Sequence, residues 1–257
     1  MPLLKKAGAV TQVDHLWLKT NRGAEIQKNI DKCVPFTDIF TLRYSGRPIF
    51  YVDTWEDIAK RVIADKKTLY TYNINNAMAM PEMATMRFST GWFFRTVGTG
   101  CTGYYLFVYQ TSDGGPYNDF DGGSTDSIQQ YPPSKKRDTL GGPALYWEAT
   151  REGIDDLKYI LTLENLIEKY EGNPQAAAAV SDAKKLLAEF KSSFDIEKLK
   201  KECVFLESKW DKSAIDSKGQ RIAEGQFNLP NGWTFEQYDK ARRQLADAIV
   251  GIMQASK

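Results

Sequence analysis

Polar and aromatic side chains gather at the ends of the predicted strands, where they can bind a ligand rich in hydroxyl groups. Such a ligand needs amide or carboxylate partners for its hydroxyls and an aromatic ring as a platform. The predicted substrate-binding residues are Tyr72, Asn73, Asn75, Tyr109, Gln110 and Asp121. A structural interpretation stays open, because an asparagine can cap a helix and an aspartate beside a glycine often forms a turn.

Two isolated carboxylates, Asp53 and Asp119, are the weak candidates for catalytic groups. Asp53 ends the predicted strand 47–53, and Asp119 lies in a loop rich in glycine and aspartate. Cleavage of a glycosidic bond normally needs two groups that flank it, one an acid and the other a nucleophile or base. Neither aspartate has a partner at a fixed spacing, although barrel strands far apart in sequence can converge at one face.

Composition argues against several classes of protein. The 34 basic residues nearly cancel the 33 acidic ones, which argues against a general nucleic-acid binder. Three widely spaced cysteines and one histidine (His15) predict neither a disulfide framework nor a zinc site, and the Asp-rich loop lacks the spacing of a calcium loop. No run approaches the ~18 apolar residues of a membrane span. We therefore expect no metal, no cofactor, no nucleic acid and no membrane span.

Strand-like and helical patterns alternate up to about residue 110. This rhythm, without hairpin turns, predicts parallel strands joined by crossover helices. Four such strands would make half of an eight-stranded barrel; an open doubly wound sheet is the competitor, but the dinucleotide-type glycine loop is missing. The predicted strands are 13–18, 36–44, 47–53, 68–74 and 103–110, and the predicted helices are 24–33, 54 onward and 86–97.

A long loop and a helical region complete the chain. The loop 111–142 follows the last predicted strand, which would place it at the C-terminal face of a barrel, where active sites of that fold lie. Apolar residues at helical spacing predict helices over 144–170, 174–190, 196–210 and 234–255. We therefore predict an α/β fold with a barrel-like half over 1–142 and a helical region over 143–257.

The segment 145–159, LYWEATREGIDDLKY, carries a resemblance to a known family. It is similar to a helix near the end of glycoside-hydrolase-like (β/α)8-barrel proteins, which include β-N-acetylgalactosaminidase-type enzymes. Arg87 and Trp92 resemble that family's penultimate helix, and 238–242 resembles its terminal helix. The resemblance implies a carbohydrate-active domain, the C-terminal part of a glycoside hydrolase acting on glycans, and an extracellular or cell-surface location.

The chain departs from the family in its catalytic residues. Those glycosidases resemble one another in an adjacent Asp-Glu pair after a mid-barrel strand, and no such dipeptide occurs here. The start of the chain reads like the tail of a helix, which predicts an upstream polypeptide or a second copy that completes the barrel. Two alternatives stay open: a catalytically silent sugar-binding module, and a structural or assembly protein that reuses a half-barrel.

Charged residues in the same segment predict a structural role. Arg151 lies three residues after Glu148 and four before Asp155, so it can bridge carboxylates on one face of a helix. We expect Arg151 to be partly buried and to tie the C-terminal helices to the barrel. The predicted structural residues are Arg87, Trp92, Trp147, Arg151, Glu152 and Asp155.

Overall fold

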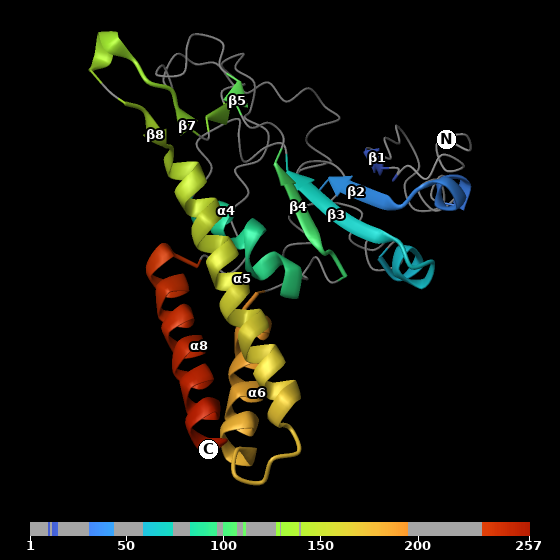
Figure 1. Cartoon of the computed structure of the whole chain (residues 1–257), viewed down its shortest axis with the longest axis vertical. Helices are drawn as coiled ribbons and strands as arrows, with labels where there is room; N and C mark the ends of the chain where they lie inside the picture. The colour runs from blue at the N-terminus through green and yellow to red at the C-terminus, as the bar shows by residue number, and fades with distance from the viewer. Residues whose placement is uncertain are drawn as a thin grey trace, which may run out of the picture. The chain divides into compact units, whose positions relative to one another are not determined.

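A computed structural model of the chain divides into two compact units (Figure 1). Unit 1 comprises Met1–Pro81, Gly98–Ala144 and Glu197–Phe227; unit 2 comprises Glu82–Val97, Leu145–Ile196 and Asn228–Lys257. The structure describes residues 10, 12–14, 31–43, 59–73, 83–96, 100–106, 110–111, 127–128, 130–138, 140–194 and 233–257.

Unit 1 contains a parallel sheet whose four strands follow one another in chain order (Figure 1). They are β1 (Gln12–Asp14), β2 (Ile39–Arg43), β3 (Thr68–Asn73) and β4 (Gly103–Leu106). Every neighbouring pair is parallel. The prediction of parallel strands is confirmed for these four, and the chain is a mixed α/β protein. The predicted strand 47–53 lies outside the described residues.

A helical segment precedes β3 and shows how the sequence builds the crossover. Residues 59–64 are helical, with Val62 buried. In the turn after the helix, Lys66 has the left-handed φ of 55°, and the N–H of Lys67 donates to the carbonyl oxygen of Val62 at 3.0 Å. This closure satisfies the last carbonyls of the helix and turns the chain into β3. In the strands, Phe40 and Leu69 are fully buried.

Two short antiparallel ladders follow β4. Of the predicted strand 103–110, Gly103–Leu106 forms β4 and Gln110 belongs to β5, while 107–109 lie outside the described residues. The first ladder joins β5 (Gln110–Thr111) to β6 (Ser127–Ile128), and the second joins β7 (Gln130–Tyr131) to β8 (Gly142–Pro143).

Unit 2 is a bundle of helices. Its long members are α5 (Leu145–Tyr170), α6 (Ala177–Ser192) and α8 (Phe235–Ala255), which pack against one another (Figure 1). These confirm three of the four helices predicted after residue 143; the fourth, 196–210, lies outside the described residues. A capping box begins α8: the Gln237 N–H donates to Thr234 Oγ1, and the Thr234 N–H donates to Gln237 Oε1.

The helical unit also includes a segment from the middle of the strand region. After β3 the chain enters unit 2, forms α4 (Met83–Thr90) and the 3-10 helix η4 (Trp92–Arg95), and then returns to unit 1 for β4. The predicted boundary at 142–143 groups this segment with the strands, whereas the structure places it in the helical unit. The reason is burial: nearly every described side chain of α4 and η4 is buried, the polar Arg87, Ser89 and Thr90 included, and a segment buried in this way must be surrounded by other elements.

The predicted helix 86–97 is wrong in its bounds, because α4 begins three residues earlier and a glycine interrupts the helix. A Cβ atom on Gly91 would lie 2.6 Å from the carbonyl oxygen of Gly153 on α5. The two helix backbones thus approach each other where neither carries a side chain. Thr90 strengthens this contact, since its hydroxyl donates to the carbonyl oxygen of Thr150 at 3.1 Å.

Candidate functional site

Two of the predicted sugar-binding residues lie where the C-terminal ends of the parallel strands meet, which we call the carboxyl edge of the sheet. Tyr72 and Asn73 are the last two residues of β3. In the register of the sheet, Tyr72 pairs with Arg43 and Tyr105, and Asn73 pairs with Leu106. The carboxyl edge is where parallel α/β folds bind ligands. The backbone therefore presents these two residues where a binding site would be built.

The other predicted ligand-binding and catalytic residues are not brought into this site by the described structure. Gln110 begins β5, opposite Ile128 in an antiparallel ladder. The remaining candidates lie outside the described residues: Asp53, Asn75, Tyr109, Asp119 and Asp121.

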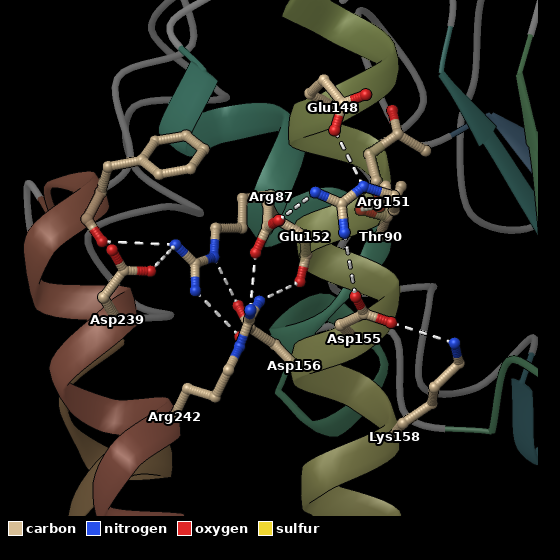
Figure 2. Close-up of polar contacts among 12 residues, drawn as sticks. Arg87, Thr90, Glu148, Arg151, Glu152, Asp155, Asp156, Lys158, Asp239 and Arg242 are labelled. Carbon is tan, nitrogen blue, oxygen red and sulfur yellow. Dashed lines mark hydrogen bonds and ion pairs between the residues drawn. The ribbon is translucent and has the colours of Figure 1, made fainter.

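The best-defined polar cluster lies in the helical unit, and we call Arg87, Glu152, Asp156, Asp239 and Arg242 the arginine–carboxylate cluster (Figure 2). Its centre is a bidentate pair in which Arg87 Nε and Nη2 donate to the two oxygens of Asp156 at 2.7 and 3.0 Å. The exposed fraction of the Arg87 side chain is 0%, and that of Asp156 is 1%. A charged pair this deep persists only with full hydrogen bonding.

Helix α8 completes the cluster from the other side. Arg242 Nε donates to Asp156 Oδ1 at 2.6 Å, and Arg242 Nη1 donates to Glu152 Oε2 at the same distance. Arg87 Nη1 reaches Asp239 Oδ1 at 2.6 Å. Figure 2 shows that the two arginines, from α4 and α8, converge on carboxylates of α5. The cluster thus joins three helices that are far apart in sequence.

Burial and the partner charges act against each other at the centre of the cluster. Burial raises the pKa of Asp156 above that of an ordinary aspartate, and the hydrogen bonds and charges of Arg87 and Arg242 oppose the rise. The rings of Phe235 and Tyr238 add cation–π contacts to Arg87, with centroids 4.9 and 5.2 Å from its guanidinium carbon. The ionised aspartate therefore depends on both arginines.

The prediction that Arg151 pairs with a carboxylate is confirmed, but the predicted role of tying the helices to the sheet region is wrong. Half of its side chain is exposed, and its partners among the described residues, Glu148, Glu152 and Asp155, lie on its own helix, at 2.8, 2.6 and 3.5 Å. The spacing correctly indicated a bridge along one face of α5. The connection between helices is made by Arg87 and Arg242.

We expect the substitution Arg151→Ala to leave the melting temperature of the helical unit nearly unchanged. Exposed pairs on one helix are screened by water and offset by the entropy lost in ordering long side chains. Thermal unfolding followed by circular dichroism at 222 nm checks this, with Arg242→Ala as the matched variant. A loss for Arg151→Ala equal to that for Arg242→Ala would contradict the assignment.

The two predicted structural tryptophans occupy different environments. Trp92 is fully buried in an aromatic cluster of unit 2, with ring centroids 5.4 Å from Phe190 and 5.7 Å from Phe194. Trp147 lies on α5 and is 44% exposed. Packing accounts for the structural role of Trp92, because edge-on and tilted aromatic contacts of this kind stabilise a core.

The arginine–carboxylate cluster is suited to holding helices together, not to catalysis. Both oxygens of Asp156 accept hydrogen bonds from guanidinium groups, so the carboxylate has neither a proton to donate nor a free face. Within the described parts of the chain, no group of three His, Cys, Asp or Glu residues is arranged to bind a metal. Burial also raises the pKa of the Cys101 thiol, which makes it a poor nucleophile.

Sequence reasoning left Asp156, Asp239 and Arg242 out of the structural residues. One signal pointed to Asp156: it shares the helix face of Ala149, Ile160 and Leu163, and a charge in such a stripe needs a buried partner. The periodicity of α5 does not identify the partners of Asp156, because they come from helices 69 and 86 residues away.

Comparison with known proteins gives no family assignment. No protein-family model matches the sequence, and no curated protein matches it significantly. Among the described helices, none is both long and apolar enough to cross a membrane.

Proposed function

We propose that the chain is a carbohydrate-active domain, the C-terminal part of a glycoside-hydrolase-like (β/α)8 barrel that acts on glycans. The observation that carries the proposal is the parallel order β1-β2-β3-β4, which is the order expected of successive barrel strands. The glycoside-hydrolase-like segment 145–159 lies within α5, the helix that supplies both carboxylates around which Arg87 and Arg242 converge.

Sugar binding is the part of this proposal that the purified chain can test directly. We expect N-acetylhexosamine oligosaccharides to bind weakly, and Tyr72→Ala and Asn73→Ala to lower the affinity, because both residues end β3 at the carboxyl edge. Isothermal titration calorimetry measures the effect. Tyr159→Ala is the matched control, since this tyrosine is 37% exposed on α5 in the other unit. No binding, or equal losses in all three variants, would contradict the proposal.

Hydrolysis by this chain alone is not expected. A glycosidase needs two flanking groups, and the candidates Asp53 and Asp119 have no partner at a fixed spacing. We expect no release of chromophore from a chromogenic N-acetylhexosaminide above the rate without protein. Robust turnover that disappears in Asp53→Asn or Asp119→Asn would show that the chain contains a complete catalytic site.

A further inference from the structure

The loop between β7 and β8 carries three consecutive cations. Residues 132–141, which we call the basic hairpin loop, contain Lys135, Lys136 and Arg137 in the 3-10 helix η5, and both lysines are exposed. Three cations against the single acid Asp138 give the loop a charge of +2, whereas the whole chain has +1. The remaining residues therefore sum to −1, so this loop carries a positive charge that the chain as a whole does not.

The backbone holds these cations on a well-defined turn. Asp138 has a left-handed φ of 47°, and its N–H donates to the carbonyl oxygen of Lys135 at 3.3 Å. Gly141 has a φ of 80° and packs so closely that a Cβ there would meet the carbonyl oxygen of Tyr131. Pro132 and Pro133 restrict the chain further. A preformed turn of this kind lowers the entropy cost of binding a partner.

We propose that the basic hairpin loop binds an anionic glycan, a chain that carries sulfate or uronic acid groups. The inference rests on the proposed function, and it specifies the class of glycan. Ammonium and guanidinium groups form charge-assisted hydrogen bonds with sulfate and carboxylate oxygens.

We choose a glycan over two other anionic partners. A nucleic acid would offer phosphate oxygens for the same charge-assisted contacts, and the proposed carbohydrate-active function decides for the glycan. Surfaces that recruit anionic lipids by charge generally use about four to eight basic residues, and the loop has three beside one acid.

The test compares charged and uncharged oligosaccharides on the full chain. Heparin and hyaluronan oligosaccharides should bind more tightly than uncharged N-acetylglucosamine oligomers, with an affinity that falls as sodium chloride rises, because the contacts are ionic. The double variant Lys135→Gln/Lys136→Gln should lower the affinity for heparin by about tenfold. A loss of this size corresponds to the binding free energy that two exposed ion pairs can contribute. The control Lys185→Gln/Lys240→Gln, two exposed helical lysines of unit 2, should retain it.

The outcomes separate this inference from the proposed function. Binding of uncharged oligomers with no gain for the anionic ones would overturn the inference and leave the proposed function standing; binding of neither would overturn both. Leu140 is 94% exposed in the same loop, and its substitution distinguishes binding to a lipid surface from binding to a glycan. Under our proposal, Leu140→Ser leaves heparin binding unchanged. Binding to phosphatidylserine vesicles that is lost in Leu140→Ser, without binding to heparin, would identify a lipid contact and overturn the inference.

Discussion

Replacing Asp156 with asparagine is expected to lower the free energy of unfolding of the helical unit by about 3 to 5 kcal/mol, the usual cost of removing one partner from a buried ion pair. Arg87 is completely buried, and the substitution would leave it with Asp239, whose own side chain is 54% exposed, as its remaining carboxylate. Arg242 would lose its partner at 2.6 Å as well. The large effect arises because two guanidinium groups each lose a carboxylate partner, and the guanidinium of Arg87 is fully buried.

Urea unfolding followed by circular dichroism at 222 nm measures this loss. The neighbouring substitution Asp155→Asn is the matched control, because Asp155 is 29% exposed and pairs with Arg151 and Lys158 on its own helix. It should cause little change. Similar losses for the two variants would mean that the arginine–carboxylate cluster does not hold the helices together.

Replacing Gly153 with alanine is the second change with a large expected effect. The new Cβ atom would collide with the hydroxyl of Thr90 and with the backbone carbonyl of Arg87, and a backbone carbonyl cannot move aside as the end of a side chain can. Overpacking in a dense core costs about 1–3 kcal/mol, and a backbone collision belongs at the upper end of that range. The separation of α4 from α5 would have to increase, which would also disturb the bond from Arg87 to Asp156.

The same substitution at Gly251 provides the control. Gly251 lies inside α8, and a Cβ there meets nothing within 4 Å. Alanine is favoured over glycine in a helix interior by about 0.5–1 kcal/mol, so Gly251→Ala should stabilise the protein. Thermal unfolding of the two variants should therefore shift in opposite directions. A stable Gly153→Ala variant would show that α4 does not pack against α5 as closely as described.

Local patterns in the sequence predicted much of the secondary structure. The helix periodicity over 144–170 and 234–255 led to bounds within one residue of α5 and α8. Successive buried runs predicted parallel strands, because a buried strand is apolar on both faces and a parallel partner requires a crossover. Tyr72 and Asn73 were placed at a strand end by the same reasoning.

The spacing of charged residues predicts contacts along one helix but not contacts between helices. The positions of Glu148, Arg151 and Asp155 predicted contacts that depend only on the helical repeat, and these contacts are present. The same spacing also led to the prediction that Arg151 joins the C-terminal helices to the barrel. That prediction failed because the charge pattern of one helix says nothing about its distance from another helix. Arg87 and Arg242 make that connection across 69 and 86 residues of sequence.

By itself, the sequence determined the order and type of the long helices and of the four parallel strands, since these follow from side-chain periodicity, caps and turn residues within a few positions. The short strands β6 and β7 lie in the segment predicted as a loop. Only the tertiary structure decided that α4 leaves the strand region to join the C-terminal helices, and that Asp156, not Arg151, lies at their centre. The physical reason is that burial depends on which surfaces meet. A helix with apolar residues on several faces, a glycine and a charge in an apolar stripe each require a partner, and none of them specifies which distant segment supplies it.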